Sequence, residues 1–331
     1  MNDIQAIKEK LESVPRLRMS IIPTPIHKLE HVGTTLSCHL FCKRDDLTGF
    51  AFGGNKVRKL DYLIWDAIHQ GADSIVTFGA TQSNWCRMTA AAGAVNGLKV
   101  YLVLAGKEPD TLTGNLILDR LAGAQMEFVD TDDEELIRSK TRSRIDYLKQ
   151  RGHHPYFMAV GGSDALGSLG YLRAFLEISE YSMQTGQNFD HIFVASGSAG
   201  TQAGLVTGQL ISQWKGTIIG ITVSRAAPDQ EEIICTLVQE TCNQLNFDVT
   251  MTQIQKHVIC DDGYLGGGYR HNTPGCLEAI EWFARKEGIF LDEVYTGKAA
   301  AGLIDYCRTG KIGMNDQTLF IHTGGHVQLF E

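Results

Sequence analysis

Short apolar runs alternate with longer segments of helical periodicity along most of the chain. From about position 40 onward, the apolar runs are HLFCK, SIVTF, KVYLVL, QMEFV and PYFMAV, and each is short enough to be a buried strand. The segments between them have helical periodicity: KLDYLIWDAIHQ, the stretch from Asn84 to Asn96, TGNLILDRLAG and a stretch that begins at Asp132. Alternation of this kind predicts the α/β class, with parallel sheets covered by helices on both faces.

A second series of the same kind begins near Gly161. It contains a helical segment from Asp164, the strand HIFVAS, a helix from Thr201, the strand TIIGITVS, a helix after Pro228 and the strand TLFIHTGG. The glycine-rich segment VGGSDALGSLG between the two series is therefore a predicted domain junction. Ligands of open α/β sheets bind beyond the carboxyl ends of the strands, so functional residues are expected in the loops that follow them.

The beginning of the chain predicts a surface helix rather than a signal peptide. In MNDIQAIKEKLESV, the apolar residues Ile4, Ile7 and Leu11 recur at helical spacing among charged residues. No apolar run is long enough to span a bilayer, so we expect no membrane partner. The singly spaced cysteines described below favour a cytoplasmic location. The length of 331 residues favours two moderate domains over one small module.

Charge and cysteine spacing narrow the class of partner. The formal net charge is −8, whereas nucleic-acid binding requires a basic face, so we expect a small-molecule substrate and no nucleic acid. The eight cysteines occur singly, without a C-x-x-C pair or zinc-finger spacing. We therefore predict reduced cysteines in the protein core and no metal site.

The segment SGSAGT, at 196–201, follows a predicted strand and opens a predicted helix. Backbone N–H groups in such a loop converge on an anion at the positive end of the helix dipole, which favours a phosphate site. A glycine-rich turn that binds nothing is an equally good interpretation of this loop alone. Gly197, Gly200 and Gly204 also give a loose dinucleotide pattern, and Arg225 could meet a 2′-phosphate, which keeps an NADP-dependent reductase as a minor alternative.

The segment GGNKVRKL places Lys56, Arg58 and Lys59 at the opening of a helix, where the helix dipole disfavours cations. A ligand phosphate at the 196–201 loop would explain this, because Lys59 could neutralise it. Lys56 would then be available to form a Schiff base with an aldehyde, since nearby cations and burial depress the pKa of a lysine. The alternative is that both are solvated surface lysines.

The segment TFGATQSNWCR ends a strand and enters a helix through Ser83 and Asn84. Both residue types are good helix N-caps, and as caps they need no ligand. Their side chains, together with the free N–H groups of the first turn, could also bind a carboxylate.

Taken together, GGNKVRKL, GATQSN, ASGSAGT, VYTGKAAAGL and FIHTGG resemble the pyridoxal-phosphate enzymes of the tryptophan synthase β-subunit-like class, known as fold type II. Within that class the resemblance is to the D-cysteine desulfhydrase and 1-aminocyclopropane-1-carboxylate deaminase family, in collinear order from about Pro23 to Phe330. It implies two open, mainly parallel α/β domains with pyridoxal 5′-phosphate in the cleft between them, and a homodimer. The large domain would comprise 1–56 and 164–331, and the small domain 57–163.

The resemblance also implies roles for individual residues. Lys56 would hold the cofactor covalently, and Asn84 would bind its ring hydroxyl. Ser83 would bind the substrate carboxylate, and Tyr295 and Tyr269 would line the substrate face, so that Lys56, Ser83, Tyr269 and Tyr295 form the predicted catalytic set. The remaining cofactor contacts would be Lys59 and the loop residues Gly197, Ser198, Ala199, Gly200 and Thr201 at the phosphate, with Thr296 and Thr323 near the pyridine nitrogen.

The chain departs from the family pattern in two places. Similar proteins commonly have His or Gln after Ser-Asn, whereas this chain has Trp85, which we expect to reshape the substrate pocket. The loop YLGGGYRHNTPG places Arg270, His271 and Asn272 where Gly-x-Pro is usual. His271 is either a solvated loop residue or, with Arg270, a substrate-binding residue for an anionic group such as a sulfonate.

The resemblance therefore implies a pyridoxal-phosphate-dependent lyase that performs α,β-elimination on a small amino acid such as D-cysteine, giving pyruvate, ammonia and sulfide. The alternatives are an L-cysteate sulfo-lyase and a 1-aminocyclopropane-1-carboxylate deaminase. A protein that binds the cofactor or an amino acid without catalysis is a further alternative of another class, since fold alone does not establish function.

Overall fold

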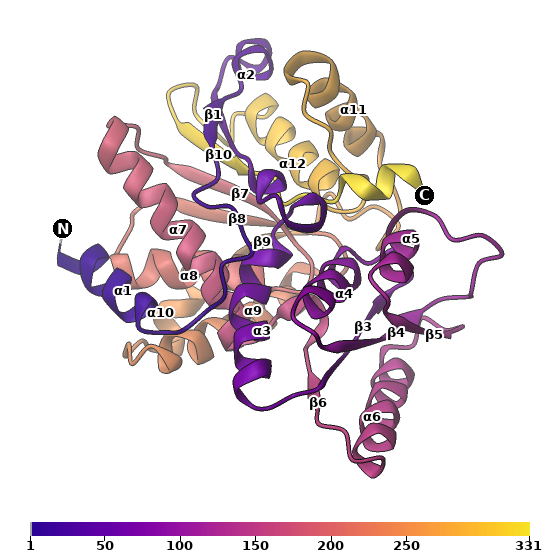
Figure 1. Ribbon diagram of the computed structural model, residues 1–331. Coiled ribbons are helices and arrows are strands. Elements are labelled where there is room, and N and C mark those ends of the chain that lie inside the picture. Colours follow the sequence, from indigo (N-terminus) through magenta and orange to yellow (C-terminus); the bar gives the residue numbers. More distant parts are fainter. Residues whose placement is uncertain (1) are drawn as a thin grey trace.

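Two sheets organise the computed structural model, which describes residues 2–331. The larger sheet has β1 antiparallel to β2 and all other neighbours parallel, in the order β1 (Ile26–Lys28), β2 (His39–Lys43), β10 (Gln317–Ile321), β7 (His191–Ser196), β8 (Thr217–Thr222) and β9 (Ile259–Asp261). The smaller sheet is entirely parallel, in the order β5 (Gln125–Val129), β4 (Lys99–Ala105), β3 (Ser74–Ala80) and β6 (Pro155–Phe157). Figure 1 shows the two sheets side by side, and the predicted α/β class is confirmed.

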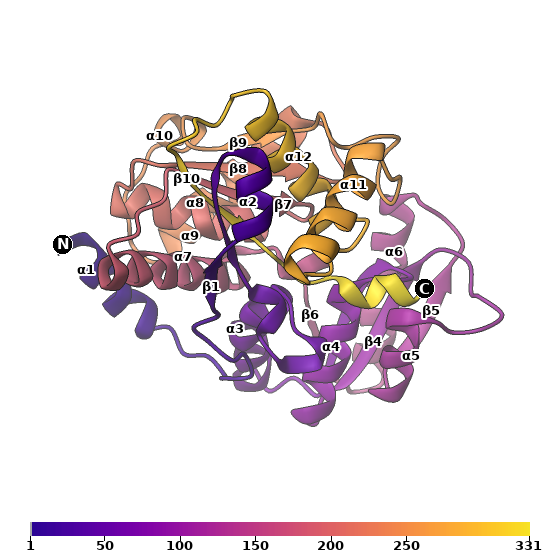
Figure 2. The same cartoon turned by 90° about the horizontal axis from the view of Figure 1, so that it is seen from above.

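Helices cover both faces of the larger sheet, which explains why its central strands are apolar without alternation. One face packs against α2 (Glu30–Leu36), α11 (Pro274–Trp282) and α12 (Thr296–Arg308). The other face packs against α7 (Ala165–Thr185), α8 (Gly200–Ser212), α9 (Ala227–Gln244) and α10 (Met251–Gln255). These two layers of helices are seen on opposite sides of the strands in Figure 2.

The smaller sheet is covered in the same way. Its one face packs against α3 (Lys56–His69), α4 (Asn84–Val95) and α5 (Gly114–Leu121), and its other face packs against α6 (Glu134–Gln150). The predicted first helix is α1 (Asn2–Glu12), whose buried Ile7 and Leu11 pack against α7 residues such as Leu172. No helix within residues 2–331 is long and apolar enough to cross a bilayer.

Side-chain caps set the start of three helices that the sequence predicts. The Oγ of Ser83 accepts a hydrogen bond from the N–H of Cys86 at the start of α4. The carboxylates of Asp133 and Asp164 accept backbone N–H groups at the starts of α6 and α7. Each cap satisfies a donor that the first helical turn leaves without a partner.

Short irregular helices join these elements, and the last of them carries the C-terminal segment to the smaller sheet's side of the molecule (Figure 1). They comprise the 3-10 segments Asp45–Leu47, Phe50–Phe52, Val160–Gly162 and His326–Phe330, and a π-helical turn at Phe283–Glu287. The last 3-10 segment lies beside α5, and Gln328 Nε2 donates to the carbonyl oxygen of Gln82 at 3.1 Å. The sheets divide the chain near the predicted junction, between β6 and α7, and the domain limits 1–56, 57–163 and 164–331 stay a prediction.

Candidate active site

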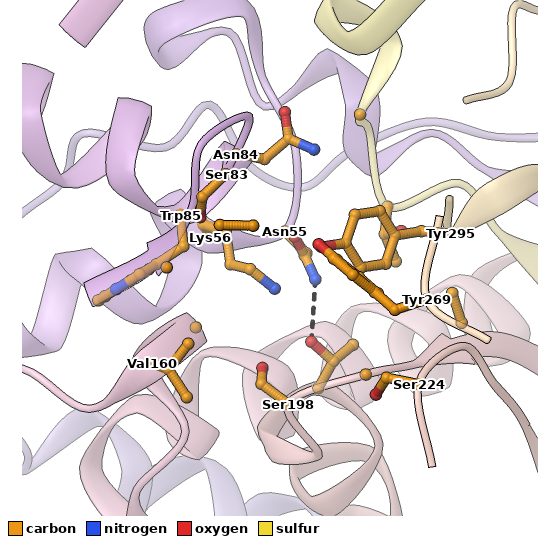
Figure 3. Close-up of a pocket in the computed structure, with 18 of the residues that line it drawn as sticks. Asn55, Lys56, Ser83, Asn84, Trp85, Val160, Ser198, Ser224, Tyr269 and Tyr295 are labelled. Carbon is orange, nitrogen blue, oxygen red and sulfur yellow. Dashed lines mark hydrogen bonds between the residues drawn. The ribbon is translucent and has the colours of Figure 1, made fainter. Parts of the chain in front are cut away.

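A cavity of about 260 Å³ lies where the carboxyl ends of strands from both sheets face each other. Its walls come from the turn before α3, the β3–α4 junction, the 196–201 loop after β7, and the segments after β8 and β10. Figure 3 shows side chains from these elements converging on one space. This is the expected location of a ligand site in open α/β sheets, and five separated sequence motifs meet there.

Lys56 is the first residue of α3, and its amino group points into the middle of the cavity in Figure 3. Burial alone lowers the pKa of the Lys56 amine to about 8. A lysine with this pKa is partly neutral near physiological pH, and the neutral amine is the form that adds to an aldehyde. Lys56 is therefore placed and activated for covalent attachment of a carbonyl compound.

Two glycines place Lys56 by allowing a close approach of backbone segments. Gly53 and Gly54 have φ values of +70° and +122°. A Cβ at Gly53 would lie 1.9 Å from the carbonyl oxygen of Asp46, and one at Gly54 would lie 3.0 Å from that of Thr323. Because a side chain at Gly53 would collide with backbone, the GG pair is needed for the turn that aims Lys56 at the cavity.

The 196–201 loop lies across the cavity from α4 and leads into the N-terminus of α8. Ala199 has φ +74°, a conformation that costs energy for a residue with a side chain and is often found at binding loops. The loop is tied to both neighbouring segments, since Ser163 Oγ donates to Ser198 Oγ at 2.8 Å and Asn55 Nδ2 donates to Thr201 Oγ1 at 3.0 Å. A preformed loop at a helix N-terminus suits an anion.

Lys59 lies behind this loop and is fully buried. Its Nζ donates to the carbonyl oxygen of Gly161 at 2.9 Å, and a Cβ added to Gly200 would lie 2.9 Å from the same nitrogen. Burial, together with the nearby Lys56, lowers the pKa of Lys59 well below its usual value. A phosphate bound at the loop would supply a negative charge that stabilises the protonated form of Lys59, which burial disfavours. The pair of lysines therefore fits a ligand that joins an aldehyde to a phosphate.

Ser83 and Asn84 form the wall at the start of α4, and both are nearly buried. Ser83 Oγ accepts the Cys86 N–H at 3.2 Å, so its own proton is not used in that bond. The N-terminus of α4 and this hydroxyl together can bind a carboxylate. The Oδ1 of Asn84 accepts hydrogen bonds from Arg87 and Asn115, and its amide nitrogen lies on the other side.

Tyr269 and Tyr295 lie together on the wall opposite Ser83 (Figure 3). Tyr295 immediately precedes α12, and Tyr269 comes from the loop between β9 and α11. Lys298 fixes that loop, because its Nζ donates to the carbonyl oxygens of Leu265 and Gly268 at 2.8 Å each. Both hydroxyls can therefore serve as proton-transfer groups at one end of the cavity.

The two threonines expected near a pyridine nitrogen have different surroundings. Thr323 lines the cavity, beside Gly324. Thr296 is not part of the cavity lining, and its hydroxyl donates to Asp292 Oδ1 at 2.6 Å while accepting the Asp292 N–H at 2.9 Å. The Thr296 hydroxyl is therefore committed to the buried Asp292, and Thr323 is the one of these two threonines that lines the cavity.

Trp85 is 2% exposed and turns away from the tyrosine pair, toward the core of the smaller sheet (Figure 3). Its indole Nε1 donates to Thr77 Oγ1 at 2.8 Å, and a Cβ on Gly162 would lie 2.9 Å from the ring. Part of its surface still lines the cavity. Trp85 is thus a packing residue whose effect on the substrate pocket stays a prediction.

In the loop that departs from the family pattern, Tyr269 lines the cavity, whereas Arg270, His271 and Asn272 lie outside its lining. His271 is exposed, and Arg270 forms an ion pair with the carboxylate of Glu331. Arg225, considered above for a 2′-phosphate, lines the cavity, where its Nη1 donates to the carbonyl oxygen of Gly197 at 3.0 Å. Residues 2–331 contain no cluster of three side chains suited to a metal ion.

Three residues near the site were missed by sequence reasoning, although two carried a local signal. Arg87 lies one turn after Asn84 on α4, a spacing at which helical side chains meet. Asp292 lies just before α12 and is of a residue type that accepts the free N–H groups at a helix start, as it does from Tyr295 and Thr296. Asn115 carried none, because it reaches Asn84 only through the packing of α5 on α4.

Comparison with known proteins gives a consistent result. A model of the family described as "Pyridoxal-phosphate dependent enzyme" matches residues 17–324. The chain is 40% identical to the D-cysteine desulfhydrase of Serratia proteamaculans (strain 568), covering 98% of each chain, and 39% identical to that of Klebsiella pneumoniae (strain 342), covering 97% of each. A crystal structure of an ACC deaminase homologue superposes with a TM-score of 0.90 at 37% identity, covering 98% of this chain and 96% of the other.

Proposed function

The chain belongs to the family of pyridoxal-phosphate-dependent enzymes, and from this premise we propose that it is a lyase that eliminates the β-substituent of D-cysteine. The reaction consumes D-cysteine and water and releases pyruvate, ammonia and hydrogen sulfide. The observation that carries the proposal is that the buried amine of Lys56, the capped helix at Ser83 and the Tyr269–Tyr295 pair share one cavity.

The residues around the cavity fit the cofactor. Lys56 would bind its aldehyde, and the 196–201 loop, comprising Gly197, Ser198, Ala199, Gly200 and Thr201, would bind its phosphate with Lys59 behind it. Asn84 would meet the ring hydroxyl, and Thr323 would lie at the ring nitrogen. When bound, pyridoxal 5′-phosphate supplies an electron sink that stabilises negative charge at the α-carbon of the substrate.

The protein groups would then orient the substrate and move protons. The Ser83 hydroxyl and the N-terminus of α4 would hold the substrate carboxylate, which fixes the direction of the α-hydrogen. The Nζ of Lys56 would take up that proton, because its lowered pKa makes it a competent base near neutral pH. Tyr295 would donate the proton that leaves with the sulfur, with Tyr269 hydrogen-bonded to it.

Among the alternatives, cleavage of the cyclopropane amino acid is favoured by one observation, the 37% identity to the ACC deaminase homologue. A sulfonate substrate is less well supported for two reasons. The carboxylates of Asp132 and Glu134 line the cavity and would repel a second negative charge, and Arg270 already has a carboxylate partner in Glu331. The presence of Lys56, Ser83 and both tyrosines argues against a protein that only binds the cofactor.

The test is a product assay with the purified holoenzyme. The 2-oxo acid and ammonia, which all four substrates would release, are measured with D-cysteine, L-cysteine, L-cysteate and 1-aminocyclopropane-1-carboxylate, and sulfide is measured with the two cysteines. D-cysteine is expected to give the largest kcat/KM. Lys56→Ala is expected to abolish turnover, whereas Lys215→Ala, at an exposed lysine, serves as the matched control. Absence of sulfide release from D-cysteine by the holoenzyme would refute the proposal.

We also propose a cytoplasmic homodimer. Three exposed apolar side chains, Ile21, Leu47 and Phe52, belong to adjoining segments joined by the hydrogen bond from Ile21 N to the carbonyl oxygen of Thr48. A cluster of this kind is typical of a protein–protein interface. The eight cysteines are free, in keeping with a reducing compartment. Light scattering is expected to give a dimer mass for the parent and a larger monomer fraction for Leu47→Asp.

A further inference from the structure

The side-chain amide of Asn84 has a fixed orientation. Its Oδ1 accepts a hydrogen bond from Arg87 Nη1 at 2.8 Å and another from Asn115 Nδ2 at 3.1 Å. The oxygen and nitrogen of an amide are often interchangeable, but a guanidinium has only donors, so the atom that meets Arg87 must be the oxygen. The amide nitrogen is therefore left to face the cavity, as Figure 3 shows.

Arg87 is held in place by neutral acceptors. Its Nη1 uses both hydrogens, one for Asn84 Oδ1 and one for Asn115 Oδ1, each at 2.8 Å, and its Nη2 donates to the carbonyl oxygen of Gly53 at 3.3 Å. The side chain is 2% exposed. No carboxylate within residues 2–331 forms a salt bridge with it, since neither oxygen of Asp119, the nearby acid, has a hydrogen-bond partner.

Asn115 is fixed just as firmly and is fully buried. Its backbone N–H donates to Gln82 Oε1 at 2.8 Å, and its Nδ2 donates to the carbonyl oxygen of Gln82 at 2.9 Å. Its Oδ1 can then only accept, which it does from Arg87. The three side chains Asn84, Arg87 and Asn115, here called the amide clamp, admit one hydrogen-bond arrangement.

We propose that Arg87 and Asn115 are positioning residues that hold Asn84 as a hydrogen-bond donor toward the ring oxygen of the bound cofactor. The inference rests on the proposed function, because it takes the ring oxygen to lie at Asn84. A donor at that place favours the ionised ring oxygen, whereas an acceptor would favour the protonated hydroxyl. Arg87, at the cavity wall, and the buried Asn115 both donate to Asn84 Oδ1, and the amide clamp thereby sets the ionisation state of the cofactor ring through the amide nitrogen of Asn84.

The geometry also links the amide clamp to the cofactor lysine. Arg87 belongs to α4, Asn115 to α5, and the Gly53 carbonyl to the turn that precedes Lys56. One guanidinium therefore joins the wall that carries Asn84 to the turn that aims Lys56. Removing it should affect both the hydrogen bond to the ring oxygen and the fit of the cofactor.

The test uses two variants of the amide clamp and pyridoxal 5′-phosphate without an amino acid. Asn115→Ala removes one donor to Asn84, and Arg87→Gln removes the group that fixes its orientation. We expect each to weaken cofactor binding about tenfold, the equivalent of one hydrogen bond. We also expect the absorption band of the ionised ring to lose intensity to the shorter-wavelength band of the protonated ring at a given pH.

A third variant inverts the polarity of the contact. Asn84→Asp keeps the shape of the side chain at position 84 and gives Arg87 a carboxylate partner, so we expect the variant to fold. Its carboxylate oxygens present only hydrogen-bond acceptors to the cavity. It should shift the absorption band further than Asn115→Ala does. Asn96→Ala is the matched control: Asn96 is the C-cap of the same helix, its side chain donates to the Ala92 carbonyl oxygen and to Met19 Sδ, and its replacement should change neither affinity nor spectrum.

The outcomes separate this inference from the proposed function. If the parent binds the cofactor and all three clamp variants keep its affinity and spectrum, the positioning role is refuted while the lyase assignment stands. If the parent releases no sulfide from D-cysteine but the variants shift the spectrum, the lyase assignment fails and the positioning role stands. A parent protein that binds no cofactor would overturn both.

Discussion

The hydroxyl oxygens of Tyr269 and Tyr295 lie 2.6 Å apart on one wall of the cavity. Burial raises the pKa of both phenols, and for Tyr295 the neighbouring Tyr269 raises it further. Both hydroxyls therefore remain protonated at neutral pH. Because one hydroxyl donates to the other, the pair has one proton left to offer a ligand.

We predict that Tyr295→Phe lowers kcat for D-cysteine by about 100-fold, the usual size of a lost proton-transfer group. Cofactor content should remain that of the parent, because Tyr295 is not part of the proposed phosphate or aldehyde contacts. Tyr147→Phe, at an exposed phenol, is the control and should retain parent activity. An unchanged kcat for Tyr295→Phe would show that its hydroxyl moves no proton in the slow step.

Much of the fold could be predicted because its signals are local. The runs SIVTF and QMEFV correspond to β3 and β5, and the caps at Ser83 and Asp164 mark helix starts in the sequence itself. The convergence of five motifs was also predictable, since the carboxyl ends of parallel strands meet at one edge of a sheet.

What could not be predicted depends on contacts between distant segments. The cations at the start of α3 needed an explanation that only tertiary structure supplies: Lys59 donates to Gly161, 102 residues away, and Arg58 is bound by Asp45 and Glu177. The orientation of Trp85 also depends on tertiary contacts. Its indole donates to Thr77, and its ring occupies space that a side chain at Gly162 would fill. A sequence motif therefore identifies a wall of the site without fixing which way each side chain turns.

The lowered pKa of Lys56 predicts how apo-protein captures the cofactor. Only the neutral amine adds to the aldehyde, so the rate should rise with pH and reach half its maximum near the folded-state pKa of about 8. An ordinary lysine would respond near pH 10.4. The rate is measured by mixing apo-protein with pyridoxal 5′-phosphate at a series of pH values and following the absorbance. A midpoint near that of an ordinary lysine would contradict the assignment.

Asp119 predicts a pH dependence of stability. Burial raises the pKa of its carboxyl from 3.8 to about 8, partly offset by Arg87. Between these values the folded state holds a proton that the unfolded state has released, so stability is lost as the pH rises from about 4 to about 8. The slope from this group is at most about 1.4 kcal/mol per pH unit.

Asp119→Asn lacks this titration, so its stability relative to the parent should increase as the pH rises through the same window. Urea unfolding of both proteins at pH 5 and pH 8 provides the measurement. A constant difference between the parent and Asp119→Asn would mean that Asp119 is ionised in the folded protein.

Trp85→His is predicted to lower stability by roughly 2–4 kcal/mol, because a buried indole and its hydrogen bond to Thr77 are lost from the core of the smaller sheet. Since Trp85 also lines the cavity, the smaller ring should raise kcat/KM for larger amino acids relative to D-cysteine. Thermal unfolding and a substrate series measure the two effects separately. Trp85→Phe keeps most of the volume and should lie between the parent and Trp85→His.

The last prediction is that elimination from D-cysteine is faster than opening of the cyclopropane ring. Of the two threonines, Thr323 lines the cavity, and the hydroxyl of Thr296 is committed to Asp292. The carboxylates that line the cavity, among residues 2–331, are those of Asp132 and Glu134 at the start of α6, whereas Thr323 belongs to the segment after β10. A threonine hydroxyl can leave the ring nitrogen neutral, whereas a carboxylate would favour its protonated, more strongly electron-withdrawing form. A weaker electron sink suffices to expel a thiol but is less suited to breaking a carbon–carbon bond.

We therefore expect kcat/KM for pyruvate formation from D-cysteine to exceed that for 2-oxobutanoate formation from 1-aminocyclopropane-1-carboxylate. Thr323→Glu should narrow the gap between the two substrates, with Thr309→Glu, at an exposed helix end, as its control. A larger kcat/KM of the parent enzyme for the cyclopropane substrate would show that Thr323 does not give the enzyme a preference for elimination from D-cysteine.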